Sequence, residues 1–201
     1  MQANHTELLL LDIGGVLLAD AMPAIFEDIA TSEGTDWGDD LAHFHRDYLS
    51  TKLWSGQLTE SQYWDSIAGF VGTDKRKEWR EHLVAYLRPL VAASQFCQWA
   101  YTVPIWLLSN HRAEWVYLAL RRAEIERCVS RCFISSEQGL VKPDIRAFLE
   151  VLQQWHGNPT SILFVDDRQS NIEVAQRLGM QALRADVDGE WKQRINYIIY
   201  R

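Results

Sequence analysis

The sequence has few cysteines and no cluster of residues that would hold a zinc ion. Cys97, Cys128 and Cys132 are an odd number without CxxC spacing, which argues against a disulfide framework or a zinc site. Cys128 and Cys132 lie close in sequence, but no histidine or further cysteine stands near them at ligand spacing. We therefore expect buried, reduced thiols, as in a cytosolic protein.

Long apolar runs and runs of basic residues are also missing. No apolar stretch approaches the roughly 18 residues that a membrane-spanning helix needs, and the N-terminus lacks the basic segment of a signal peptide. The formal net charge of −7, without any run of Lys and Arg, argues against nucleic-acid binding. We expect a soluble, cytoplasmic protein. If such an acidic protein handles a phosphate, a metal ion or local donors must offset the repulsion.

Three short apolar runs are present, and each ends abruptly in polar residues. Residues 8–11 precede Asp12, residues 105–108 precede Ser109, and residues 162–165 precede Asp166. Continuous apolar runs of this length predict strands that are buried on both faces of a parallel sheet. Ligands bind outside the carboxyl ends of such strands, so we expect these polar residues to converge on one site.

Helical patterns alternate with these runs. Ser170 and Glu173 have the spacing of a capping box, and Gly179 is expected just past the end of that helix. Pro143 is expected at the first position of the preceding helix. The alternation of strands and helices predicts a doubly wound, parallel-sheet, Rossmann-like α/β core.

Residues 19–95 have a different character. They contain no strong buried-strand run, many aromatic residues, and a helix start with Thr59 as N-cap and Gln62 at N3. We expect an inserted, mostly helical cap of three or four helices in this segment. The α/β core would then consist of residues 1–18 and 96–201.

Four blocks of the sequence, in order, resemble the motifs of the haloacid dehalogenase superfamily. They are residues 10–17 (LLDIGGVL), 107–110 (LLSN), 139–144 (GLVKPD) and 164–167 (FVDD), and together they frame nearly the whole chain. The resemblance is greatest to small phosphatases with a helical cap inserted after the first motif. It implies a Mg²⁺-dependent hydrolase that acts on a small phosphorylated molecule.

The resemblance also implies roles for individual residues. Asp12 would be the nucleophile and form an aspartyl-phosphate, since metal ligation and backbone donors can orient a carboxylate toward phosphorus. The Ser109 hydroxyl and the following N–H would hold the phosphoryl group, with Asn110 as a further amide donor. Lys142 would neutralise the charge of the phosphate and the nucleophile. His111, which follows Ser109 and Asn110 in the sequence, is placed to touch the substrate.

A magnesium site is expected from the paired acids. Asp166 and Asp167 would repel each other at a buried strand end unless a cation lay between them, and Mg²⁺ prefers oxygen ligands and keeps several waters. The implied ligands are Asp12, the Gly14 carbonyl, Asp166, phosphate and water. Asp167 would ligate directly or through water, or would orient Lys142.

The sequence departs from the family pattern at Gly14. Most phosphatases of the superfamily carry a second Asp there, which protonates the leaving group and later activates water. The metal role survives because it uses the backbone carbonyl, and Gly15 allows the backbone to approach the substrate closely. Another group, with Asp20 as the candidate acid, would then supply the proton, or the substrate would have a good leaving group.

Three other interpretations remain open. A dehalogenase also lacks this Asp, but it dispenses with the metal that the paired acids indicate. A phosphonatase would need a cap lysine such as Lys52. A non-catalytic module would bind a phosphorylated ligand or a partner protein, although the intact nucleophile, lysine and acid pair favour the phosphohydrolase.

Some further residues have two interpretations each. Arg112 and Arg168 follow strand ends and could contact a substrate anion, but exposed arginines are common. Trp54 and Trp64 could line the substrate surface of the cap, but packing explains them as well. Exposed aromatic residues in the cap would allow a homodimer, so the chain is expected to be a monomer or a homodimer.

Overall fold

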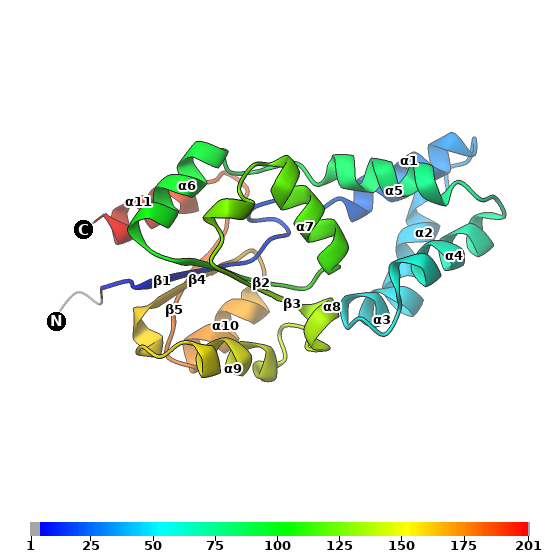
Figure 1. The fold of residues 1–201 in the computed structure, drawn as a ribbon. Coiled ribbons are helices and arrows are strands. Elements are labelled where there is room, and N and C mark those ends of the chain that lie inside the picture. Colours follow the sequence, from blue (N-terminus) through cyan, green and yellow to red (C-terminus); the bar gives the residue numbers. More distant parts are fainter. Residues whose placement is uncertain (1–4, 201) are drawn as a thin grey trace.

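A computed structural model describes residues 5–200 and contains a five-stranded, all-parallel sheet with helices on both faces (Figure 1). The strand order is β3-β2-β1-β4-β5. The strands are β1 (Leu8–Leu11), β2 (Ile105–Ser109), β3 (Arg131–Ile134), β4 (Ile162–Asp166) and β5 (Gln181–Arg184). The predicted doubly wound α/β core is confirmed. Residues 1–4, which belong to the predicted first core segment and N-terminus, and residue 201 lie outside the described part.

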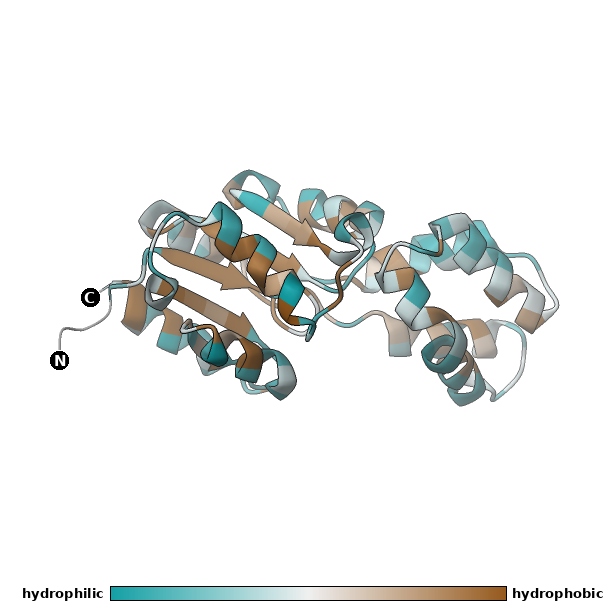
Figure 2. Ribbon diagram, turned by 90° about the horizontal axis from the view of Figure 1, so that it is seen from below, coloured by the Kyte–Doolittle hydropathy of each residue, from teal (hydrophilic) through white to brown (hydrophobic). Residues whose placement is uncertain are grey.

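The three predicted apolar runs form the middle of the sheet, and all residues of β1, β2 and β4 are buried. Successive side chains of a strand point to opposite faces. Leu9 and Leu11 therefore pack with one set of core residues, and Leu8 and Leu10 with another. The strands accordingly appear as the most uniformly hydrophobic elements in Figure 2.

Two layers of helices cover the sheet. Helices α6 (Ala93–Thr102), α7 (Ala113–Arg122) and α11 (Trp191–Ile199) lie on one face, and α9 (Ile145–Gln154) and α10 (Gln169–Arg177) on the other (Figure 1). The large buried side chains Trp99 and Trp115 pack on the Leu9 side, and Phe148 packs on the Leu8 side.

The helix ends agree with the sequence at some positions and differ at others. Gly179 follows α10 with a φ of +84°, as predicted. Ser170, however, lies inside α10, because Asp166 accepts the N–H of Arg168 and the helix begins earlier. Pro143 lies before α9, whose N-cap is Asp144. The predictions that Ser170 caps a helix and that Pro143 begins one are therefore wrong.

The cap helices lie together at one end of the core (Figure 1). They are α1 (Met22–Ser32), α2 (Gly38–Phe44), the π-helical turn η1 (His45–Leu49), α3 (Ser50–Trp54), α4 (Glu60–Val71) and α5 (Arg76–Tyr86). Residues 22–86, all described, thus hold more helices than the three or four predicted. Helix α4 has the predicted capping box between Thr59 and Gln62.

The two chain segments that join cap and core run side by side. The N–H of Ala19 donates to the Arg88 carbonyl at 2.8 Å, and the N–H of Leu90 donates to the Leu17 carbonyl at 2.8 Å. Helix α6, which begins at Ala93, contacts α11 of the core. We propose this double connection as the boundary of the cap.

The cysteines are not all reduced, contrary to the sequence-based expectation. Cys97 in α6 and Cys128 in η2 (Glu126–Cys128) form a disulfide, with their Cα atoms 5.4 Å apart, within the usual range for such a bond. Cys132 is free and half-buried. The bond differs from the reduced state that is usual for cytosolic thiols.

None of the helices in residues 5–200 is long and apolar enough to cross a membrane.

The cap interior contains a buried histidine. His45 packs against Phe26, Trp54 and Tyr63, with ring centroids 5.3 to 5.8 Å apart, and only 7% of its surface is exposed. Burial lowers the pKa of His45 to about 4, although the charge of Asp20 opposes the shift. The ring is therefore neutral in the folded protein at physiological pH.

This depressed pKa should make the cap sensitive to acid. Between about pH 6.5 and pH 4 the unfolded chain binds a proton at His45 that the folded chain does not. The free energy of unfolding should therefore fall as the pH is lowered, with His45 contributing about 2 kcal/mol of this loss at pH 5. Denaturant titrations of wild type and His45→Phe at about pH 7.5 and pH 5 measure it. Equal acid sensitivity in the two proteins would contradict the prediction.

Candidate active site

The carboxyl ends of β1, β2 and β4 bring the predicted catalytic residues together. Asp12 follows β1, Ser109 ends β2 and Asp166 ends β4. Lys142, in the loop between α8 (Ser135–Gln138) and α9, reaches into this edge of the sheet. Its Nζ lies 3.1 Å from Asp12 Oδ1 and 2.6 Å from Asp166 Oδ2. All four side chains are buried.

Asp12 lies in an environment with opposing electrostatic effects. Burial, reinforced by the negative charge of Asp166, raises the pKa of Asp12 to about 6. Lys142, the Ser109 hydroxyl and the N–H of Ile13, which donates to Asp12 Oδ1 at 2.6 Å, stabilise the charged form. The carboxylate is thus poorly hydrated but directed by fixed donors, as a carboxylate nucleophile requires.

Asp166 is held more firmly than Asp12. Its Oδ1 accepts the N–H of Arg168 at 2.8 Å, and the side-chain amide of Asn171 donates to both carboxylate oxygens at 2.9 Å. Together with the ion pair to Lys142, these bonds show that Asp166 orients the lysine. The sequence offers that role to Asp167 as one of three alternatives.

The acidic residues at this edge fit a magnesium ion. Ligand oxygens of Asp12, Asp166 and Asp167 lie within 4.8 Å of one another. Three carboxylates against the positive charges of Lys142 and Arg168 leave an excess of one negative charge. Burial and Asp166 raise the pKa of Asp167, although the charges of Arg168 and Lys142 oppose the shift. An all-oxygen set with excess negative charge is what Mg²⁺ prefers.

The loop after Asp12 requires glycine next to this cluster. Gly15 has a φ of +73°, and a Cβ there would lie 2.8 Å from Asp167 Oδ2. Its N–H donates to the Leu18 carbonyl at 2.8 Å, and Gly15 lines the cavity described below, so its contact with substrate stays a prediction. At Gly14, by contrast, a Cβ would meet nothing within 4 Å.

Asn110 positions the lysine. Its side-chain amide donates to the Lys142 carbonyl, and its Oδ1 accepts the N–H of Lys142, both at 2.8 Å. The sequence analysis expected Asn110 to donate to the substrate and missed this contact. The two residues are 32 positions apart, and no local pattern reveals the pairing.

A cavity of about 80 Å³ lies between core and cap, and Ser109 and Asp166 are not among the residues that line it. The polar wall includes Asp12, Asp20, Asn110, His111, Lys142 and Asp167. The cap contributes apolar surface from Met22, Trp54, Leu83 and Leu87, and the core contributes Trp115. Trp54 thus lines the cavity, whereas Trp64 is buried against other aromatic rings. Arg168 also borders the cavity.

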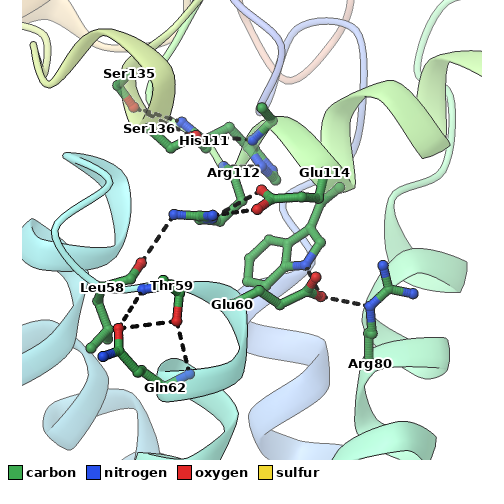
Figure 3. Close-up of polar contacts among 12 residues, drawn as sticks. Leu58, Thr59, Glu60, Gln62, Arg80, His111, Arg112, Glu114, Ser135 and Ser136 are labelled. Carbon is green, nitrogen blue, oxygen red and sulfur yellow. Dashed lines mark hydrogen bonds and ion pairs between the residues drawn. The ribbon is translucent and has the colours of Figure 1, made fainter.

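Arg112 holds the cap against the core (Figure 3). Its guanidinium donates to the Leu58 carbonyl at 3.0 Å and pairs with Glu114. Only 7% of the Arg112 surface is exposed, so the interpretation of a surface arginine is wrong. Nearby, Glu60 Oε1 accepts from the Trp115 indole at 2.5 Å and from Arg80 at 2.6 Å.

Comparison with known families agrees with this geometry. The haloacid dehalogenase-like hydrolase family model matches residues 6–179. The chain therefore belongs to this hydrolase family. A curated relative, the D-ribitol-5-phosphate phosphatase of Bacteroides thetaiotaomicron, is 29% identical over 69 residues. The match spans 34% of this chain and 34% of that relative.

Solved structures show the same fold. A HAD family enzyme from Bacteroides thetaiotaomicron has a TM-score of 0.80 at 20% identity, covering 94% of this chain and 98% of that one. Its complex with magnesium and inorganic phosphate has a TM-score of 0.77 at 21% identity over the same shares. A Porphyromonas gingivalis protein, described as a predicted HAD-like hydrolase, has a TM-score of 0.79 at 20% identity over 98% of each chain.

The acidic cluster yields a direct binding test. Asp167→Asn replaces one charged oxygen by a neutral amide group, so the Mg²⁺ affinity should fall by about tenfold or more. Isothermal titration calorimetry measures the affinity, and thermal unfolding checks the fold. Asp188→Asn, at an exposed acid outside the cluster, is the matched control and should bind as wild type does. Equal affinities of both variants would remove Asp167 from the proposed ligands.

Proposed function

We propose that the protein is a Mg²⁺-dependent phosphohydrolase that removes phosphate from a small phosphorylated metabolite. The observation that carries this proposal is the buried Asp12, with Lys142 Nζ 3.1 Å from its Oδ1 at the wall of the cavity. The phosphatase relative and the magnesium and phosphate complex of the structural neighbour support it.

The chain's own residues suit a two-step reaction. Asp12 attacks phosphorus, the bond to the leaving oxygen breaks, and an aspartyl-phosphate forms, while the leaving oxygen departs as a stable anion or takes a proton from water. Lys142 balances the added negative charge, and the Ser109 hydroxyl holds the phosphoryl group. Water then hydrolyses the acyl phosphate, which releases inorganic phosphate and restores the carboxylate.

The metal would add positive charge where the phosphoryl group is transferred. Asp12, Asp166, Asp167 and the carbonyl of Gly14 would hold it, with phosphate and water completing an oxygen shell. A bound Mg²⁺ supplies electrostatic stabilisation of the transferring group. The donor set described above is consistent with this role.

The cavity favours a small substrate. A volume of about 80 Å³, closed on the cap side by Trp54, Leu83 and Leu87, leaves room for a compact leaving group beside the phosphate. Because cap helices form part of this wall, binding of substrate would exclude water from the reacting atoms.

Loss of the nucleophile provides the decisive test. Asp12→Asn should lower kcat for phosphate release by a factor on the order of 1,000 or more, because an amide cannot form the covalent intermediate. Release from acetyl phosphate and alkyl phosphates, with Mg²⁺ and with EDTA, measures it, and Asp188→Asn serves as the control. Absence of release from wild type, with Mg²⁺ still bound, would instead indicate a non-catalytic module.

The missing acid at position 14 can be restored, because Gly14 has space for a side chain and no positive φ. Gly14→Asp should raise the rate for alkyl phosphates, whose leaving oxygen needs a proton, by roughly tenfold or more. Acetyl phosphate, with its good leaving group, should gain little. Gly14→Asn has the same size without a proton to give and is the control. An equal response of both variants would contradict the prediction, because the gain would then not come from the carboxyl proton.

A further inference from the structure

We propose that His111 and Asp20 form a donor and acceptor pair that selects substrates whose leaving group carries a hydroxyl, such as a polyol or sugar phosphate. The proposal deepens the phosphohydrolase function above and rests on it. It concerns the cavity between core and cap, which both residues line, and it adds a recognition role to the chemistry at Asp12 and Lys142.

The backbone around His111 is firmly held. The N–H of His111 donates to the Ser135 hydroxyl and the N–H of Ala113 to the Ser136 hydroxyl, both at 3.0 Å (Figure 3). Asn110, one residue earlier, is tied to Lys142 by two hydrogen bonds. The loop that carries His111 is therefore fixed relative to the phosphate-binding end of the site.

The imidazole itself is held in one tautomer. The N–H of Arg112 lies 2.9 Å from His111 Nδ1, and because a backbone N–H only donates, Nδ1 must be the acceptor. A neutral ring then carries its proton on Nε2. Burial lowers the pKa of His111 to about 4, so the ring is neutral at physiological pH. His111 is thus a fixed neutral donor.

The ring position is also restricted by aromatic neighbours. Trp54 of the cap and Trp115 of the core lie against His111, with ring centroids 5.5 and 5.9 Å away. Both tryptophans line the cavity. Their apolar faces suit the carbon backbone of a small polyol, while the polar atoms between them suit its hydroxyls.

Asp20 supplies the complementary acceptor. It lies where the chain enters the cap, its Oδ1 accepts the N–H of Met22 at 3.0 Å, and it borders the same cavity. Its negative charge acts on both His111 and His45. A hydroxyl both donates and accepts, so an N–H and a carboxylate that line the same cavity match it, and an analogue without the hydroxyl leaves both groups unpaired.

The test compares glycerol 1-phosphate with propyl phosphate, which lacks the hydroxyls. Wild type with Mg²⁺ should prefer glycerol 1-phosphate in kcat/KM by about tenfold or more. His111→Phe keeps an aromatic ring but removes the donor, so the preference should fall to within about twofold of unity. His111→Gln, which retains a side-chain N–H, should restore part of it. Asp20→Asn, which removes the charge and replaces one acceptor oxygen by an amide donor, should lower it.

His156→Phe is the matched control, because His156 is exposed and does not line the cavity; it should keep the wild-type preference. Rates on acetyl phosphate normalise those on the two esters. An unchanged preference in His111→Phe, or no preference in wild type, would overturn the proposal.

A binding measurement separates this inference from the proposed function. In Asp12→Asn, calorimetric titration with glycerol 1-phosphate and with propyl phosphate reports recognition without turnover. Tighter binding of glycerol 1-phosphate that is lost with His111→Phe supports the His111 and Asp20 pair. This holds even if wild type releases no phosphate, because a lack of release would refute only the hydrolase function. Equal affinities for the two esters would overturn the pair. Imidazole ¹⁵N shifts must also show Nε2 protonated, and a proton on Nδ1 would contradict the fixed donor.

Discussion

The site depends above all on one buried ammonium group placed between carboxylates. Parallel pairing aligns Leu11 of β1 with Val165 of β4, so Asp12 and Asp166 emerge side by side at one edge of the sheet. Two neighbouring buried carboxylates repel each other. The ammonium group of Lys142, a residue with 4% of its surface exposed, pairs with both and offsets that repulsion. The Asn110 side chain holds the backbone of Lys142 by hydrogen bonds to both its N–H and its carbonyl. The same charge that stabilises the fold is then available to a phosphoryl group.

The sequence predicts the centre of the sheet well and its edges poorly, for a physical reason. The strands β1, β2 and β4 are buried on both faces, so every position must be apolar or small, and the pattern is unambiguous. The edge strands β3 and β5 have no such requirement. Arg131 and Arg184 are exposed, and Gln181 is only half-buried. Their short, mixed sequences resemble loops as much as strands.

Residue roles could be predicted where the partner is close in sequence and not where it is distant. The Thr59 and Gln62 capping box was predictable because its partners lie three residues apart on one turn. Arg112 meets Leu58 across 54 positions, and Cys97 meets Cys128 across 31. Only the folded chain brings such partners together, so the sequence leaves Arg112 open between a substrate contact and a surface residue, and predicts reduced cysteines.

The loop after β2 links the position of the cap to the chemistry of the core. Asn110 contacts Lys142, His111 lines the cavity, and Arg112 donates to the Leu58 carbonyl of the cap. A general acid typically contributes a factor of about 10² to 10⁴, and Gly14 cannot contribute it. Contacts to the leaving group that strengthen in the transition state can replace part of that factor. Asn110, His111 and Arg112 are consecutive, so in the proposed reaction a substrate that contacts this loop would also act on the position of Lys142, which Asn110 holds.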